Sequence, residues 1–401
     1  GYLVADKMVK GVHITNDPKN RLDIRCKNIN KLRELYSPYD YKNIITGFYN
    51  QIVNMEFYAG KKSFFYEYGF AYGGILACGF SQYLNKLAKI EKIDKFLFVA
   101  RDGYILKKVY DRYYKEYDTS YLLFSRMASY EIIFEDFPNE YIEKNIGLKI
   151  RDSKRDNSIK KILQECNLEF MEKYLAENHF YRNEQLNKKN YNRFKEFLIS
   201  HKEILISHFQ ESTQAAKQYF LHETYGCNKV CIVDIGWRGT SAVYFKHLLE
   251  NRYNWKGTVI GAMIGAASDD ITQNHIRSGL LHTYAFDNNY YRRTGKKNGE
   301  YMSREETICV EALFSAESPS LTKYTLDQHG TVDFRYQDRN LNKEIIKEIH
   351  MGIMEFTKRF APVIRKYSLE IMPRDAYTPL DYLMQNKRIR KMISNVYDEP
   401  R

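Results

Sequence analysis

The sequence predicts an α/β fold: a Rossmann-like parallel sheet with a large helical insertion and with helical N- and C-terminal segments. Two observations lead to this prediction. Short, continuous apolar runs such as FLFVA and KVCIV are each followed by a helical pattern, which is typical of parallel strands buried on both faces. A charged segment without a strand pattern, residues 151–222, separates the two units. A chain of 401 residues is also long enough for two or three domains.

The segment 26–92 is predicted to be mostly helical, because its apolar residues recur at helical spacing, as in the run from Ile45 to Met55. Four glycines interrupt it: Gly69, Gly73, Gly74 and Gly79. Glycine inside a helix lowers helix stability, so these positions indicate close packing of the backbone. A tight contact between helix and sheet is the favoured reason.

The predicted sheet begins in segment 93–150, where FLFVA forms a strand, ILKKVYDRYY a helix and SYLLFS a second strand. Segment 151–222 is then a helical insertion or cap. In segment 223–290, KVCIVDIG and GTVIGAMIGAA are strands on either side of the helix SAVYFKHLLE. We interpret both units as parts of one interrupted sheet; a second α/β domain is the alternative.

The last segment, 291–401, combines several patterns. It begins with a polar, glycine-containing stretch from Arg292 that is typical of a mobile loop. Beyond it, the sequence predicts a helix start at CVEALFSA, a hairpin at TKYTLDQHGTVDFRYQ and a basic helical end from Lys343.

The formal net charge of +12 and the pI near 9.1 predict an anionic partner, such as a phosphate, a nucleotide or a lipid headgroup. Nucleic acid is disfavoured as a partner, because Lys and Arg are interleaved with Asp and Glu along the whole chain. The apolar runs are too short to span a bilayer, the N-terminus lacks a signal-peptide pattern, and the cysteines are scattered. We therefore expect a cytoplasmic protein with at most peripheral membrane contact.

Charged and hydroxyl residues directly follow three of the predicted strands. They are Arg101, Asp102 and Gly103 after FLFVA; Ser125 and Arg126 after YLLF; and Asp234, Gly236, Trp237, Arg238, Gly239, Thr240 and Ser241 after KVCIV. Ligands of open parallel sheets bind beyond the carboxyl ends of the strands. Arginine suits bidentate phosphate binding, glycine allows close approach of the backbone, and hydroxyls add donors. The pattern therefore predicts a site for a phosphate or a phosphorylated sugar.

The strand-end residues also have purely structural explanations. Asp102 and Asp234 stand where aspartate commonly caps the following helix. Trp237 suits stacking on a base or sugar ring and equally suits burial beneath its loop. Because these residues follow three strands of one sheet, we interpret them together as a site.

Glu311 is a further candidate for ligand binding, since it lies in CVEALFSAESPS close to the hydroxyls of Ser315 and Ser318. A capped helix end is the favoured explanation of this stretch. His247 and His282 have no partner in the sequence, and we expect both to be ordinary core or surface histidines.

Four strings occur in this order: YEYGFAYGGILACGFSQYL, FLFVARDGYILKKVYD with YLLFSRMA, VDIGWRGTS and EALFSAESPS. In this combination the chain, from about residue 65 to 335, resembles bacterial proteins described as predicted hydrolases of the haloacid dehalogenase (HAD) superfamily. Those proteins accompany glycosyltransferases in capsule and other surface-polysaccharide clusters. The resemblance implies a HAD-type phosphatase domain at the N-terminus, and residues 1–25 are similar to the tail of such a domain, with Asp6 at its end.

When FVARDGYIL is aligned on the HAD nucleophile strand, Asp102 matches the second aspartate and Ala100 stands where the nucleophilic aspartate belongs. Without that carboxylate no aspartyl-phosphate forms. VCIVDIGWRGTS is also similar in layout to the diphosphate loop of type I phosphoribosyltransferases, and DIG-x-x-GT to a phosphate loop of actin-like ATPases. Both likenesses imply phosphate recognition.

The favoured hypothesis is an enzyme of bacterial cell-surface polysaccharide biosynthesis. It would bind a nucleotide sugar or sugar phosphate and transfer a glycosyl or phosphoryl-linked group. Asp102 and Asp234 would act as general base or bind Mg²⁺, and the arginines would hold phosphate. Two alternatives stay open: a HAD-type phosphate-ester hydrolase whose catalytic aspartate lies outside this chain, and a non-catalytic scaffold that docks glycosyltransferases.

Overall fold

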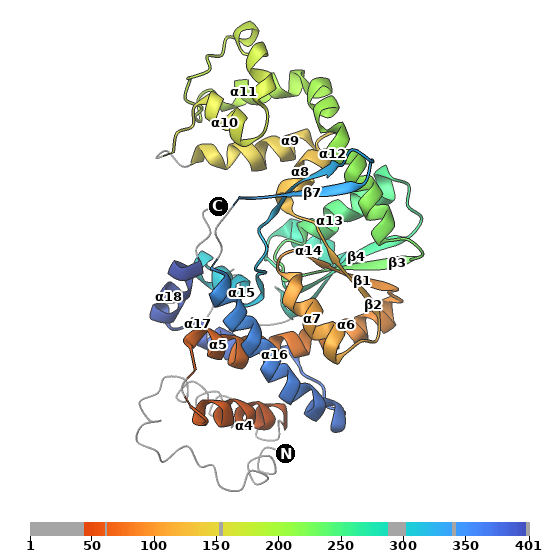
Figure 1. The fold of residues 1–401 in the computed structure, drawn as a ribbon, viewed down its shortest axis with the longest axis vertical. Helices are drawn as coiled ribbons and strands as arrows, with labels where there is room; N and C mark the ends of the chain where they lie inside the picture. Colours follow the sequence, from red (N-terminus) through yellow and green to blue (C-terminus); the bar gives the residue numbers. More distant parts are fainter. Residues whose placement is uncertain (1–43, 61, 152–154, 288–301, 339–341, 398–401) are drawn as a thin grey trace.

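A computed structural model describes most of the chain, with helices on both faces of a central sheet (Figure 1). The residues that it does not describe are 1–43, 61, 152–154, 288–301, 339–341 and 398–401. The predictions for residues 1–25 and for most of the loop after Arg292 therefore lie outside the described residues. Within the described part of the chain, no helix is both long enough and apolar enough to cross a bilayer.

The central sheet consists of five parallel strands in the order β2-β1-β3-β4-β5. They are β1 Lys95–Val99, β2 Asp118–Leu122, β3 Lys229–Asp234, β4 Thr258–Gly265 and β5 Leu281–Phe286. The predicted α/β class and parallel sheet are confirmed, and both predicted units belong to this one sheet. Strand β5 was not predicted, because His282 and Thr283 interrupt its apolar run.

The three inner strands, β1, β3 and β4, are buried on both faces, since alternate side chains enter two different hydrophobic cores. Phe96 and Phe98 of β1 enter the first core, whereas Leu97 and Val99 enter the second. Successive side chains of a strand point to opposite faces, so a strand covered on both sides needs apolar residues at every position. This explains the continuous apolar run in the sequence.

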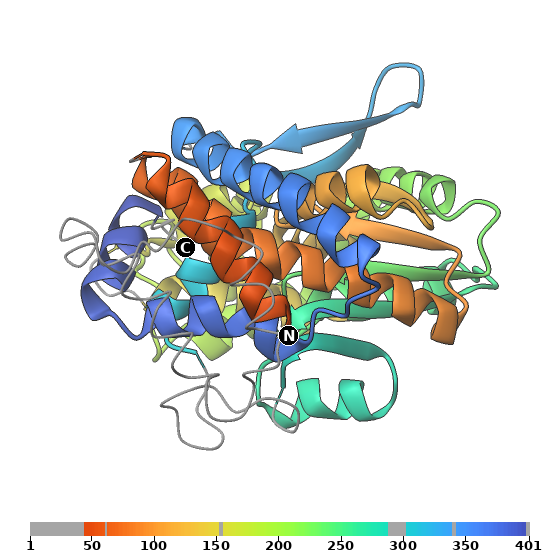
Figure 2. The same ribbon diagram turned by 90° about the horizontal axis from the view of Figure 1, so that it is seen from below.

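The first core lies under helices from both ends of the chain. They are α4 Ile44–Tyr58, α5 Phe64–Tyr68, α6 Gly74–Glu91, α7 Gly103–Tyr113, α15 Arg304–Phe314, α16 Lys343–Lys366, α17 Pro373–Met384 and α18 Lys387–Tyr397. Helix α16 packs along α5 and α6, and Figure 2 shows α4 beside it. The predicted N- and C-terminal helical segments therefore pack against each other.

Glycine allows two of these helical segments to approach closely. A Cβ at Gly69 would lie 2.0 Å from the carbonyl oxygen of Ile349 in α16, and a Cβ at Gly352 of α16 would lie 2.1 Å from the carbonyl oxygen of Tyr66. Both distances are far below a van der Waals contact. The close packing predicted at Gly69 therefore occurs between helices and not between helix and sheet. At Gly79 of α6 the predicted contact with the sheet is present, because a Cβ there would lie 2.1 Å from the hydroxyl oxygen of Tyr284 in β5.

The second core lies under a helical segment that leaves the sheet after β2 and returns at β3. Its helices are α8 Arg126–Ile133, α9 Pro138–Ile142, α10 Ile159–Glu165, α11 Tyr191–Ser200 and α12 Lys202–Glu223; α13 Thr240–Lys246 covers the same face, and α14 Asp270–Arg277 joins β4 to β5. Figure 1 shows α9, α10 and α11 at one end of the molecule, beyond α8 and α12. The described residues of the segment predicted to be helical are mostly helical, apart from an irregular stretch at about 180–190, and none of them belongs to a strand of the sheet.

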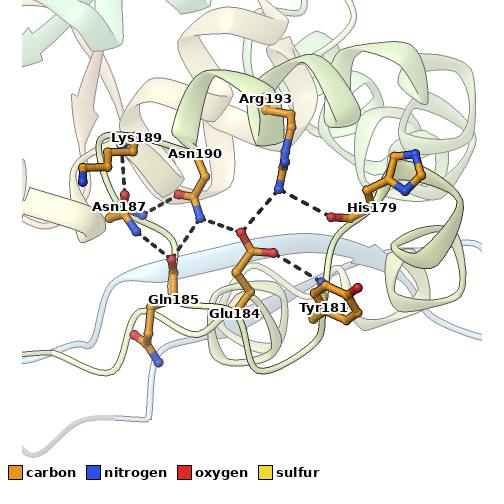
Figure 3. A network of polar contacts seen from close by, with 8 residues as sticks. All are labelled: His179, Tyr181, Glu184, Gln185, Asn187, Lys189, Asn190 and Arg193. Carbon is orange, nitrogen blue, oxygen red and sulfur yellow. Dashed lines mark hydrogen bonds and ion pairs between the residues drawn. The ribbon is translucent and has the colours of Figure 1, made fainter.

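Polar contacts hold the turn that precedes α11 (Figure 3). The Asn190 side chain donates to Glu184 Oε1 at 2.8 Å and accepts from the Asn187 amide at 2.8 Å. Arg193 approaches the same oxygen of Glu184 at 3.4 Å. Because these bonds orient neighbouring backbone segments at an exposed turn, we interpret the network as structural.

A hairpin links the helical segment to the strand ends. Its strands, β6 Leu321–Leu326 and β7 Val332–Tyr336, are antiparallel as predicted, and they pack against α12. The helix before the hairpin differs from the prediction: CVEALFSA was expected to start a helix, but α15 begins at Arg304. Ser303 and Glu306 form a capping box there, and the helix ends at Phe314.

Candidate functional site

The ends of β1 and β3 lie next to each other where the sheet changes direction. β1 leads through α7 to β2 on one side, whereas β3 leads through α13 to β4 on the other. Phe98 pairs in register with Val233, so Arg101 and Gly236 follow at the same edge. In open α/β sheets, ligands bind at such a switch point. The two strongest sequence candidates therefore converge at one place.

A distant loop holds the guanidinium of Arg101. Its Nη1 donates to Ser320 Oγ at 2.9 Å and its Nη2 donates to Ser315 Oγ at 2.7 Å. Both serines belong to the loop 315–320, and they lie 219 and 214 residues from Arg101 in the chain. Bonds at both ends of a planar group fix its orientation. The signal for this loop in the sequence was the group of hydroxyls near Glu311.

Replacing Arg101 by Lys is expected to lower the free energy of unfolding by about 1–2 kcal/mol, because a single ammonium group does not span both serines as the guanidinium does. Urea unfolding followed by circular dichroism measures the change. Arg112→Lys is the control, since Arg112 is exposed at the other end of α7; its expected change is within about 0.5 kcal/mol. Equal losses in both variants would contradict the role of the two serines.

Asp102 directly precedes α7, but its side chain forms no capping hydrogen bond with that helix. The capping explanation is therefore wrong for this residue. Asp102 is half-buried and lies near Tyr121. The next residue is a glycine, Gly103, because a side chain has no room there: its Cβ would lie 2.8 Å from the carbonyl carbon of Phe98. Helix α7 thus starts in contact with β1, which keeps Asp102 at the strand end.

Asp234 is the last residue of β3 and is half-buried. Burial raises its pKa above the ordinary value, and hydrogen bonds from the Ser241 hydroxyl and from the amides of Ile235 and Gly236 oppose that rise, as does the positive charge of Arg126. The Ile235 amide donates to Asp234 Oδ1 at 2.7 Å. A carboxyl group in this position exchanges its proton closer to neutral pH than an exposed aspartate does.

The loop between β3 and α13 uses two glycines with positive φ. Gly236 has a φ of 140° and Gly239 a φ of 65°, both unfavourable for other residues. Gly239 occupies the position before α13, and Thr240 starts the helix. Asp234 is therefore not the cap of α13, so the structural explanation proposed for it is wrong as well.

The two candidate residues that were predicted after the second strand, Ser125 and Arg126, have different environments. The Ser125 hydroxyl accepts from the Ala128 amide at 3.1 Å as the cap of α8, and it donates to the Leu321 carbonyl at 2.6 Å. Its single donor is therefore used within the protein. Arg126, the first residue of α8, is exposed, and its charge acts on Asp234 two strands away.

Trp237 and Glu311 connect the β3 loop to the end of α15. The indole stacks on Phe286 with ring centroids 6.0 Å apart, and its Nε1 lies 3.4 Å from Glu311 Oε1, a long hydrogen bond. The ring is half-buried. Arg238 is exposed and lies 3.5 Å from Asp269. The last turn of α15 and the loop after it therefore contact the ends of both β1 and β3.

Sequence reasoning missed two side chains at this edge, Tyr121 and His350. The ring of Tyr104 lies between them, with centroids 5.7 Å from Tyr121 and 5.9 Å from His350. Tyr121 and His350 do not share a sequence motif, because the three rings come from separate elements. Tyr121 belongs to β2, Tyr104 to α7 and His350 to α16.

Among the described residues, no group of three or more His, Cys, Asp or Glu side chains gathers as metal ligands. Asp102 and Asp234 are carboxylates at the ends of adjacent strands. Such a pair suits Mg²⁺ in the way common to phosphate sites, where one or two carboxylates bind the ion and phosphate oxygens and water complete its shell.

A scan against protein-family models gave no match, and a search of curated proteins gave none either. The interpretation of the site therefore depends on the geometry of this chain.

Proposed function

We propose that the protein is an enzyme that binds a nucleotide sugar or sugar phosphate at the ends of β1, β2 and β3 and transfers a glycosyl or phosphoryl-linked group. The observation that carries the proposal is the convergence of Arg101, Asp102 and Asp234 at the switch point of the sheet. A role in the cytoplasmic assembly of surface polysaccharides, beside glycosyltransferases, belongs to the same proposal and follows from the sequence resemblance.

Two arginines would hold the phosphate. Arg101 is oriented by Ser315 and Ser320, so binding would cost little further side-chain ordering. Arg126 is exposed in the first turn of α8, where the helix dipole disfavours a cation by about 0.3–1 kcal/mol. A bound anion would relieve that repulsion. These positions supply positive charge at two neighbouring strand ends.

Asp234 is the candidate general base, because a carboxyl whose pKa is raised by burial accepts a proton more readily near neutral pH. In glycosyl transfer, the acceptor hydroxyl would attack the sugar carbon that bears the phosphate, and the phosphate would leave with the bonding electrons. Asp234 would take the hydroxyl proton. Asp102 would bind a sugar hydroxyl or, together with Asp234, a Mg²⁺ ion that neutralises phosphate charge.

A thermal-shift screen tests the proposal. The probes are UDP, UDP-glucose, GDP-mannose, glucose 1-phosphate and inorganic pyrophosphate, each with and without Mg²⁺. A probe at about 100 times its Kd stabilises the folded state by about 2.7 kcal/mol. Arg126→Ala is expected to lose most of the shift without loss of its own stability, because Arg126 is exposed. Arg112→Ala, at the far end of α7, is the matched control and should keep it.

The alternatives predict other outcomes. A hydrolase would release phosphate from a generic ester without an acceptor, and a scaffold would bind none of the probes. If no probe stabilises the unaltered protein, or if Arg112→Ala loses as much of the shift as Arg126→Ala, the proposed site is wrong.

A further inference from the structure

The hydroxyl of Tyr121 is buried at this edge of the sheet and has no hydrogen-bond partner among the described residues. Tyr121 is the next-to-last residue of β2, and its ring meets Tyr104 edge to face. Arg101 and Asp102 lie close enough for their charges to act on the phenol. An unsatisfied buried polar group costs about 1–3 kcal/mol. Such a group in a native protein calls for an explanation.

The loop 315–320 lies near the Tyr121 hydroxyl. Ser318 of this loop interacts with the phenol and opposes the rise of its pKa, but the pair does not meet hydrogen-bond geometry, and Ser318 is itself exposed. It belongs to neither a helix nor a strand, so it can move aside without breaking regular structure. A ligand that enters between the loop and the strand ends would therefore reach the Tyr121 hydroxyl.

A second buried polar atom near the same loop also lacks a hydrogen-bond partner within the described part of the chain. It is Nε2 of His350, on the other side of Tyr104. Burial lowers the pKa of His350 to about 4, although the nearby backbone of Ser315 favours the charged form, so the imidazole is neutral at neutral pH. Two polar atoms that lack partners thus flank one aromatic ring under the loop that orients Arg101. This concentration favours a role in ligand binding over an isolated packing defect.

We propose that Tyr121 contacts the ligand phosphate: its hydroxyl donates a hydrogen bond to an oxygen of the phosphate group that Arg101 holds. The inference depends on the proposed function and narrows it, because it assigns the phosphate to the adjacent ends of β1 and β2. Burial raises the pKa of Tyr121, so the phenol stays protonated and remains a donor at neutral pH.

The test compares two variants that each remove one buried, unpartnered hydroxyl. Tyr121→Phe removes the proposed contact. Tyr253→Phe is the matched control, because its hydroxyl is also buried and without a partner among the described residues. Tyr253 packs against the second core shortly before β4 and thus lies at the opposite edge of the sheet. Neither hydroxyl has a hydrogen-bond partner among the described residues, so both variants are expected to keep or slightly raise Tm.

Isothermal titration calorimetry with inorganic pyrophosphate and with UDP-glucose supplies the readout. The Kd of Tyr121→Phe is expected to rise about 10- to 100-fold for the probe that binds, since hydrogen bonds to charged groups have that strength. The Kd of Tyr253→Phe should stay within about twofold of the unaltered protein. A higher Kd for Tyr121→Phe than for Tyr253→Phe, with equal Tm, would show that Tyr121 contacts the ligand and does not act through the stability of the fold.

Failure of the inference is distinguishable from failure of the proposed function. If the unaltered protein binds a probe and Tyr121→Phe binds it equally well, the role of Tyr121 is overturned while the phosphate site stands. If Tyr253→Phe weakens binding as much as Tyr121→Phe, the effect is structural and the inference is again overturned. If the unaltered protein binds neither probe, the inference and the proposed function fail together.

Discussion

Replacing Asp234 by Asn is expected to lower kcat of the proposed transfer by about 10²–10⁴-fold, the usual loss when a general base is removed. The same variant should be as stable as the unaltered protein or more stable at neutral pH. Burial raises the folded-state pKa of Asp234, which means that the fold disfavours its charged form. An uncharged amide of the same shape avoids that penalty. Loss of activity with retained stability is a known pattern at functional sites.

The raised pKa of Asp234 also predicts how the stability advantage of Asp234→Asn changes with pH. Below the unfolded-state pKa of about 4, Asp234 is protonated in both states and imposes no penalty. As pH rises from there to the raised folded-state pKa, the unfolded chain loses its proton first, so the unaltered protein loses stability across that window. The Tm advantage of Asp234→Asn should therefore be larger at about pH 8 than at about pH 3.5, by about 1–3 °C for a difference near 1 kcal/mol.

Asp269→Asn is the matched control for the pH experiment. Asp269 follows β4 and caps α14, where hydrogen bonds from Thr272 and the charge of Arg238 outweigh burial and lower its pKa. The stability that this carboxylate contributes is present above its unfolded-state pKa and lost as pH falls. Asp269→Asn should therefore show no stability gain at high pH. A similar gain in both variants, or full activity of Asp234→Asn, would contradict the role given to Asp234.

Replacing Gly236 by Ala is expected to destabilise the protein by about 3 kcal/mol or more, which is among the largest effects of single substitutions. Gly236 has a φ of 140°, and a Cβ there would lie 2.3 Å from the carbonyl oxygen of Gly265 at the end of β4. Backbone atoms of a central strand move aside only with difficulty. Urea unfolding measures the loss, and the probe-induced thermal shift should fall with it because the β3 loop is displaced.

Gly226→Ala separates the conformational penalty from the steric one. Gly226 also has a positive φ, 76°, but nothing lies within 4 Å of its added Cβ. Since the described residues leave room for this Cβ, the expected cost is about 1 kcal/mol, the ordinary penalty of a left-handed conformation. The difference between the two variants then measures the contact with Gly265. Equal costs would mean that the β3 loop is not pressed against β4.

Local sequence determined the strands and the residues at their ends. The runs FLFVA, KVCIV and GTVIGAMIGAA were recognised as β1, β3 and β4 because a strand covered on both faces needs apolar residues at every position. Arg101, Asp102 and Asp234 were found by their position just after these runs. β5 escaped prediction because His282 and Thr283 are only half-buried and break its pattern. Strands and the residues at their ends can be predicted because they depend on residues that lie close together in the sequence.

Only the tertiary structure decided what surrounds those strand ends. Arg101 is oriented by two serines more than 200 residues away, and Tyr121 and His350 meet across Tyr104 from three different elements. The capping explanations for the two aspartates also failed on geometry alone. A residue's sequence neighbours carry the information for strand and helix, whereas its hydrogen-bond partners at a sheet edge depend on which distant segments the packed core brings there.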